Sequence, residues 1–412
     1  MTNSTGSNTV PRIALLADSL ADWTGGVDFL RFCVSALNSV SPETCWPVLL
    51  PSKNRRKLLV ALVKNGVKKL AGLKTSGLAR ISTNELIGTL TISGARIEVV
   101  EYRDTLSGLV GAMRARGKEA LFPCDKSLGR YFPGPWIGYI PDLQHKRLPK
   151  WFSERERLVR DKLFSKMLAE ASAVVVNATT VIRDIEEFYP DHKARLFALP
   201  FCPPANLMRF SELSGGEMRT KYGLPAQYFM VSNQFWIHKS HETAFIALRQ
   251  VRDAGYDVHL VCTGNTFDYR WPDHFNNLQG IIERNNLRSH IHILGMIPKS
   301  DQLAIMRESI AVIQPTLFEG GPGGGALYDA VSIGAPSIVS DIQVNREIDI
   351  GVVRFFTAGS AESLAARMIE ILVDPPQILS EEDIFSQLRS RQREFGKLLL
   401  NVANWVANPQ SS

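Results

Sequence analysis

The chain has 412 residues, 45% of them hydrophobic and 21% charged, and a formal net charge of +6. This composition is typical of a globular protein with enough residues for two domains, each with its own core. Its five cysteines include no Cys-x-x-Cys pair, which excludes a disulfide framework and a cysteine zinc site; we interpret them as small buried apolar residues: Cys33, Cys45, Cys124, Cys202 and Cys262.

The first ten residues are polar and uncharged. They lack the basic and apolar regions of a signal peptide, and no apolar run in the chain is long enough to span a bilayer. We therefore expect a protein that stays in the cytoplasm.

The first predicted strand is the apolar run at 12–18, and an amphipathic helix is predicted at about 27–37. Gly25 and Gly26 lie between them. Two glycines in this place let the backbone approach a bound diphosphate or acceptor, or they form no more than a tight turn. The pair alone leaves both interpretations open.

The segment 52–80 contains nine basic residues and no acidic one, so the basicity of the chain is local. Leucines and valines recur between the lysines at helical spacing, which predicts a basic amphipathic helix suited to an anionic membrane surface. A nucleic-acid partner is disfavoured because no aromatic residue is interleaved for base stacking. The alternative is a solvated helix face packed on the N-terminal domain.

Further short strands are predicted at 97–102, 121–124 and 135–143, before a helix at 153–171 and a strand at 173–177. His145 follows the third of these strands. A lone histidine is more often structural than catalytic. The carboxyl end of a strand is, however, where α/β domains place their ligands, so we favour a site role for His145.

A strand at 195–201 ends the first half, and the linker predicted from Cys202 follows because consecutive prolines continue neither a helix nor a central strand. A second α/β repeat begins at Tyr228, and its first strand leads through Lys239 into a helix at about 243–251. The last predicted helix, 385–406, has a continuous apolar stripe.

The glycine-rich stretch after the strand at 310–314 is the strongest local signal. Five glycines and one proline lie between Gly320 and Gly325, and a helical pattern starts at Ala326. Exposed N–H groups at such a loop and helix start form an anion site that the helix dipole favours. A turn without a ligand is disfavoured, because five glycines lose much conformational entropy on folding.

Three kinds of protein use such a loop. A P-loop is excluded because no Gly-Lys-Ser or Gly-Lys-Thr ends it. A dinucleotide site remains possible, with Gly321, Gly323 and Ala326 in the glycine pattern and Asp341 as the ribose carboxylate, although five residues separate the strand from the loop.

The third kind fits more of the residues. Phe318-Glu319-Gly320, then Asp329-Ala330-Val331 and the run from Gly334 to Asp341, resemble the nucleotide-sugar signature of the family-four retaining glycosyltransferases of GT-B fold. The chain departs from that signature, since nine residues rather than seven separate the two acids and the second is Asp. It also has no Arg before Lys239, so His238 or another residue would supply the missing donor.

The resemblance implies two Rossmann-like α/β domains facing each other: an acceptor-binding domain at 1–204 and a nucleotide-sugar donor-binding domain at 205–384, with the helix of 385–412 packing back on the first. It implies catalytic roles for His145, Lys239 and Glu319. It further implies a donor site made of Gly25, Gly26, Asn233, His238, Lys239, Gly264, Met296, Ile297, Glu319, Gly320, Gly321, Gly323, Gly324, Gly325 and Asp329.

The activity implied is retaining transfer of a hexose from a nucleotide-diphosphate sugar to a hydroxyl of a glycan or lipid-linked acceptor, in bacterial surface-polysaccharide biosynthesis. No Asp-x-Asp pair occurs in the chain, so we expect no metal and no cofactor besides the donor substrate. Two other hypotheses stay open: a nicotinamide-dependent oxidoreductase that uses the same loop, and a non-catalytic nucleotide-sugar-binding module.

Overall fold

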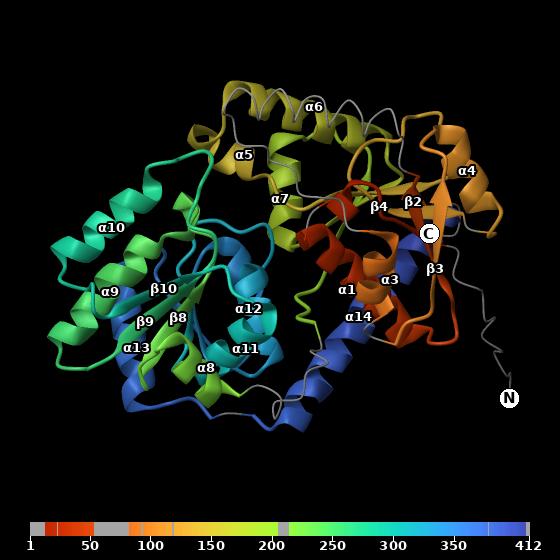
Figure 1. The fold of residues 1–412 in the computed structure, drawn as a ribbon. Coiled ribbons are helices and arrows are strands. Elements are labelled where there is room, and N and C mark those ends of the chain that lie inside the picture. Colours follow the sequence, from red (N-terminus) through yellow and green to blue (C-terminus); the bar gives the residue numbers. More distant parts are fainter. Residues whose placement is uncertain are drawn as a thin grey trace, which may run out of the picture.

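Two parallel sheets form the structure, and their central strands are apolar and buried on both faces (Figure 1). The computed structural model describes residues 13–22, 24–52, 82–91, 94–117, 119–204, 214–377 and 379–408. The basic segment predicted at 52–80 lies, except for Ser52, outside the described residues, as does the linker from Ala205 to 213. No helix among the described residues is long and apolar enough to cross a membrane.

The first sheet has seven strands, all parallel to their neighbours. In spatial order these are β3 (Ile97–Tyr102), β2 (Trp46–Pro51), β1 (Ile13–Leu16), β4 (Ala120–Cys124), β5 (Trp136–Ile140), β6 (Ala173–Val176) and β7 (Arg195–Ala198). The connecting helices are α1 (Thr24–Val40), α3 (Thr83–Thr91), α4 (Leu106–Arg114), α5 (Gln144–Arg147), α6 (Glu154–Glu170) and α7 (Thr179–Phe188).

The second sheet has six parallel strands. In spatial order these are β10 (Ile291–Gly295), β9 (His259–Thr263), β8 (Tyr228–Ser232), β11 (Val312–Gln314), β12 (Ser337–Ser340) and β13 (Val353–Phe356). Its helices are α8 (Gly215–Tyr222), α9 (His241–Asp253), α10 (His274–Arg284), α11 (Lys299–Glu308), α12 (Gly324–Ser332), α13 (Ala361–Val373) and α14 (Glu381–Ala407).

Successive side chains of a strand point to opposite faces of the sheet, and this divides the core of each half into two layers. In β1, Ile13 and Leu15 point toward α1 and α14, whereas Ala14 and Leu16 point toward α4, α6 and α7. The second sheet is divided in the same way between the side of α9, α10 and α13 and the side of α11 and α12. Helices therefore cover both faces of both sheets.

The final helix joins the two halves (Figure 1). Its first turns pack in the core of the second half through Ile384 and Leu388, and its later turns pack against α1 through Phe395 and Leu399. Gly396 allows the close approach, since a Cβ there would lie 2.1 Å from the carbonyl oxygen of Ala36. The predicted return of this helix to the N-terminal half is confirmed.

Two local predictions need correction. Helix α1 begins at Thr24, so Gly25 and Gly26 lie in its first turn rather than in a loop before it. Glycine destabilises a helix mainly in the helix interior, so its cost in the first turn is smaller. Cys45 is exposed, in the turn just before β2, whereas the other four cysteines are buried as predicted.

Candidate functional site

The carboxyl ends of strands from both sheets meet at one place. Gly320 and Gly321, after β11, lie against the residues that follow β5 and β6 in the other half. A Cβ at Gly320 would lie 2.8 Å from the carbonyl oxygen of Pro141, and one at Gly321 would lie 3.2 Å from the Cβ of Asn177. The glycine loop thus contacts the N-terminal half directly, and only residues without a side chain allow that approach.

The loop then turns through two left-handed residues, Gly323 and Gly324, with φ of 68° and 63°. Helix α12 begins at Gly324, two residues before the predicted start at Ala326, and Gly324 and Gly325 form its first turn. A Cβ at Gly324 would lie 2.7 Å from Oε2 of Glu319. The start of the helix therefore lies directly over the Glu319 carboxylate.

Lys239 and Glu319 form an ion pair beneath this loop. The distance from Nζ to Oε1 is 2.5 Å, and the two side chains are only 11% and 9% exposed. Lys239 belongs to the short helix η4 (Ile237–Lys239) after β8, and Glu319 follows β11, so neighbouring strands bring them together. The sequence singled out both residues but did not predict that they bind each other.

Gln314, at the end of β11, is a buried residue that the sequence analysis missed. Its Nε2 donates to Oε1 of Glu319 at 3.1 Å and to the carbonyl of Gly323 at 2.8 Å. Its Oε1 accepts from Nδ2 of Asn233 at 2.5 Å. The side-chain amide of Gln314 thus hydrogen-bonds Glu319, the glycine loop and Asn233. The sequence feature that could have indicated this role is a polar residue at the end of an otherwise apolar strand.

Asn233 and Gly264 touch through their backbones. Gly264 has a φ of 131°, and a Cβ there would lie 2.0 Å from the carbonyl oxygen of Asn233. Farther out, Met296 is 70% exposed, and Ile297 packs on the core of the C-terminal half. The predicted residues after β8, β9 and β10 therefore line the same edge of the sheet.

His238 is enclosed by aromatic rings from both halves. Its imidazole lies 5.9 Å from the ring of Trp151 and 5.6 Å from that of Trp236, centroid to centroid. Burial, reinforced by the charges of Lys239 and Arg270, lowers the pKa of His238 to about 2. His238 is therefore neutral at physiological pH and does not replace the missing arginine as a cation.

Arg270 is a cation beside His238 that the sequence analysis missed. Its guanidinium carbon lies 5.5 Å from the ring centres of both Phe152, in the N-terminal half, and Trp236. Its Nε lies 3.4 Å from the buried carboxylate of Asp268. Arg270 lies in the connection between β9 and α10, far along the chain from Lys239. No local sequence motif therefore predicts that the two residues are close.

His145 is turned into the N-terminal half. Its Nε2 lies 3.0 Å from Oδ1 of Asp161, the same oxygen that accepts a hydrogen bond from Tyr189 at 2.7 Å. Burial lowers the pKa of His145, and the bond to Asp161 opposes that shift. None of the described contacts joins this imidazole to Lys239 or Glu319, although Asp142, three residues earlier, borders Gly320.

Asp329, on α12, pairs with Lys299 at the start of α11. Burial raises the pKa of Asp329, and Lys299 opposes the shift. Of the other predicted residues, Gly25 is exposed and Gly26 is buried at the start of α1 in the opposite half. Among the described residues, no group of three or more His, Cys, Asp and Glu side chains is arranged to hold a metal ion.

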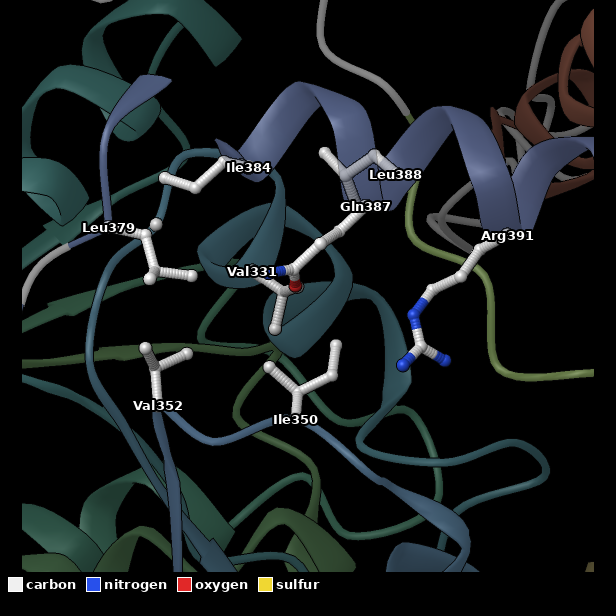
Figure 2. Close-up of a pocket in the computed structure, with 9 residues that line it drawn as sticks. Val331, Ile350, Val352, Leu379, Ile384, Gln387, Leu388 and Arg391 are labelled. Atoms are coloured by element: carbon white, nitrogen blue, oxygen red, sulfur yellow. The ribbon is translucent and has the colours of Figure 1, made fainter. Parts of the chain in front are cut away.

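A small apolar pocket lies at the other edge of the second sheet (Figure 2). It is lined by Val331, Gly334, Ile350, Val352, Leu379, Ile384, Gln387, Leu388 and Arg391. A Cβ at Gly334 would lie 2.3 Å from Cδ1 of Ile384. The pocket marks where α14 crosses the C-terminal half, and its lining includes none of the predicted donor-site residues.

Acid should destabilise the protein through His241, which is buried and stacks on Phe235. Burial, and then the charges of His274 and Lys239, lower the pKa of His241 to about 3. The unfolded value is about 6.5, so this histidine stabilises the fold above that pH; the contribution falls by about 1.4 kcal/mol for each pH unit below it. Thermal unfolding followed between pH 7 and pH 4 should show a smaller loss for His241→Phe than for the unmodified protein.

The control for this experiment is His192→Phe, a half-buried histidine in the other half. Carboxylates titrate in the same range in every variant, so the informative quantity is the difference between variants. Parallel curves for the unmodified protein and His241→Phe would contradict the prediction.

The comparisons with known proteins agree with this architecture. Residues 217–394 match the family described as glycosyl transferases group 1. A glycosyltransferase from Rickettsia africae ESF-5 is 12% identical, with a TM-score of 0.60 over 97% of this chain and 99% of that chain. Sucrose-phosphate synthase from Thermosynechococcus elongatus is 16% identical, with a TM-score of 0.57 over 96% and 97% of the two chains.

A third similar structure is that of Anabaena HepE in complex with UDP and glucose, 15% identical with a TM-score of 0.56 over 97% of this chain and 99% of that chain. No curated protein sequence matches the chain. At such identities the structures show the fold alone, whereas the family match covers β8 to β13 and the glycine loop. The chain is therefore a glycosyltransferase of GT-B fold, in which residues 217–394 match the glycosyl transferases group 1 family.

Proposed function

We propose that the protein transfers a hexose from a nucleotide-diphosphate sugar to a hydroxyl of a glycan or lipid-linked acceptor, with retention of configuration. The observation that carries this proposal is the buried Lys239–Glu319 pair beneath the start of α12. A cation and the amino end of a helix favour a diphosphate, and a carboxylate beside them suits the sugar that the diphosphate carries.

In this proposal each residue has one role. Lys239 and the first N–H groups of α12 bind the diphosphate and stabilise the negative charge that develops as it leaves. Glu319 contacts the hexose, and Gln314 holds the acid and the loop in place. Arg270 and His238 both contact the ring of Trp236, which supports Arg270 as a second cation at this site.

For His145 the contacts support a positioning role in place of the catalytic role that the resemblance implies. The residues just before it, Pro141 and Asp142, contact Gly320, so His145 stands on the segment of the N-terminal half that borders the loop. Its bond to Asp161 fixes the ring toward α6. We propose that this ring orients the segment rather than exchanging a proton with the donor.

Binding of the nucleotide donor can be tested by thermal unfolding. A melting curve of the protein should shift upward with UDP or GDP, because a ligand that binds only the folded state stabilises it. UDP is the first choice, since the Anabaena neighbour is described in complex with UDP and with UDP-glucose. Stabilisation by NAD alone would contradict the proposal. Asp341, the ribose carboxylate expected of an oxidoreductase, is bonded to Arg346 and to the N–H of Ala358.

Transfer itself needs a second assay. A screen of nucleotide sugars for hydrolysis or transfer would identify the hexose, and the anomeric configuration of the product tests retention. Nucleotide binding without any turnover across the screen would favour the non-catalytic module.

The lipid-linked acceptor and its setting in surface-polysaccharide assembly are part of the same proposal. The support is the basic amphipathic pattern at 52–80, which is suited to an anionic membrane. Retention of the protein on vesicles containing anionic lipid at low salt, and its release by the triple change of Lys64, Lys68 and Lys69 to Gln, tests this step.

A further inference from the structure

The short helix η5 (Gln343–Glu347) follows β12 of the C-terminal half but reaches into the other half. Val344 is buried in the core between the first sheet and its helices α4, α6 and α7, with Ile342 packed beside it. The chain of one half therefore supplies an apolar side chain to the core of the other. This contact lies directly beside the glycine loop.

Glu347 caps a helix of the opposite half. Helix α7 begins after Ala178, which provides no side-chain cap. Oε2 of Glu347 accepts from the N–H of Thr179 at 2.9 Å, and Oε1 accepts from the N–H and the hydroxyl of Thr180 at 2.7 and 2.6 Å. First-turn N–H groups need such an acceptor, and the helix dipole favours a carboxylate there. The start of α7 is thus completed by the C-terminal half.

Asn345, two residues earlier, fastens the glycine loop. It is fully buried, and its Oδ1 accepts from the N–H of Gly323 at 2.7 Å. Its Nδ2 donates to the carbonyl of Ser340 at 2.9 Å, so both ends of the amide are engaged. The short helix η5 therefore binds the glycine loop through Asn345 and the N-terminal half through Glu347.

We propose that η5 couples the glycine loop to the contact between the two halves, so that nucleotide binding at the loop and the Glu347 cap on α7 strengthen each other. A ligand that orders the loop orders Gly323, its bond to Asn345 and, through the turn, the Glu347 carboxylate. Coupling of this kind is reciprocal: the factor by which bound nucleotide strengthens the cap equals the factor by which the formed cap strengthens nucleotide binding. The ligand in this inference rests on the proposed function, whereas the contacts of η5 do not.

Hydrogen exchange at the N–H groups of Thr179 and Thr180 reports the cap directly. In the absence of nucleotide, Glu347→Ala should speed exchange there by roughly 2–30-fold, the range that loss of a helix cap gives, and Glu347→Gln, which keeps one acceptor oxygen, should have a smaller effect. Asn345→Ala should also speed exchange at Thr179 and Thr180, although it touches neither. Unchanged exchange in Asn345→Ala would overturn the coupling without any assumption about the ligand.

The reciprocal arm uses UDP, or GDP where only GDP raises the melting temperature. Adding it to the unmodified protein should slow exchange at the same two amides, and Glu347→Ala should bind it about 5-fold or more weakly, the lower end of measured allosteric couplings. Faster exchange in Glu347→Ala with unchanged nucleotide affinity would leave the cap purely structural and overturn the proposal. If neither nucleotide binds the unmodified protein, the proposed function fails, and the Asn345→Ala arm still decides the coupling.

The matched control is Arg346→Ala, between the two residues in the same turn. Its side chain is 65% exposed, and its guanidinium pairs with Asp341 within the C-terminal half. This variant should leave both the exchange of Thr179 and Thr180 and the nucleotide affinity unchanged. Equal effects in Arg346→Ala and Glu347→Ala would mean that any disturbance of the turn suffices, and would overturn the specific role of the cap.

Discussion

Glu319→Gln should lower turnover by about 10²–10³-fold, the loss typical when one preorganised electrostatic contact to the transition state is removed, with little change in nucleotide affinity. Both described hydrogen bonds of this carboxylate, from Lys239 and Gln314, use Oε1. Oε2 is thereby aimed at the start of α12. Glutamine keeps the size of the side chain but removes the negative charge that would stabilise a positively charged sugar in the transition state.

Steady-state turnover at saturating donor, together with nucleotide binding measured by calorimetry, separates the two quantities. Glu362→Gln is the control, since this glutamate is exposed on α13 and should leave both unchanged. Loss of nucleotide binding with normal turnover at saturation would show that Glu319 contacts the nucleotide rather than the sugar.

Lys239→Ala should weaken nucleotide binding by about 1.5–3 kcal/mol, or roughly 10–150-fold in Kd, because it removes a charge-assisted contact to the diphosphate. It should also destabilise the free protein. Glu319 would remain buried without a cation beside it. Removing one partner of a buried ion pair lowers the free energy of unfolding by about 3–5 kcal/mol. The two effects have different origins and can be separated.

The double variant Lys239→Met with Glu319→Gln makes that separation. It leaves neither charge buried alone, so chemical denaturation should show most of the lost unfolding free energy restored, while nucleotide binding stays weak. Lys221→Ala serves as control, since it removes the lysine of a more exposed pair with Asp301 on the same half and should leave nucleotide affinity unchanged. Normal nucleotide affinity and turnover in Lys239→Ala would mean that this lysine serves only as the partner of Glu319.

Much of the architecture was readable from local pattern. Runs such as Ala173–Val176 and Tyr228–Ser232 are continuous and apolar, which is what a strand covered on both faces requires, and they are strands. The apolar stripe of the last helix predicted that a surface covers it, and the resemblance to GT-B proteins implied that this surface belongs to the N-terminal half, where the helix packs. The run of glycines predicted a tight loop, since few other sequences can turn so tightly.

The sequence by itself thus determined two α/β halves, a glycine loop at a helix start, and Lys239 and Glu319 as residues of interest, because each of these has a signal within a few neighbouring residues. The tertiary structure alone decided the pairing of Lys239 with Glu319, the hydrogen bonds of Gln314 to Glu319 and the glycine loop, and the cap that Glu347 places on α7. The residues of the first pair are separated by 80 positions, and those of the cap by 167 or 168. It also turned His145 toward Asp161. Such contacts depend on how distant strands and helices pack, and a local pattern carries no information about the partner that folding brings to it.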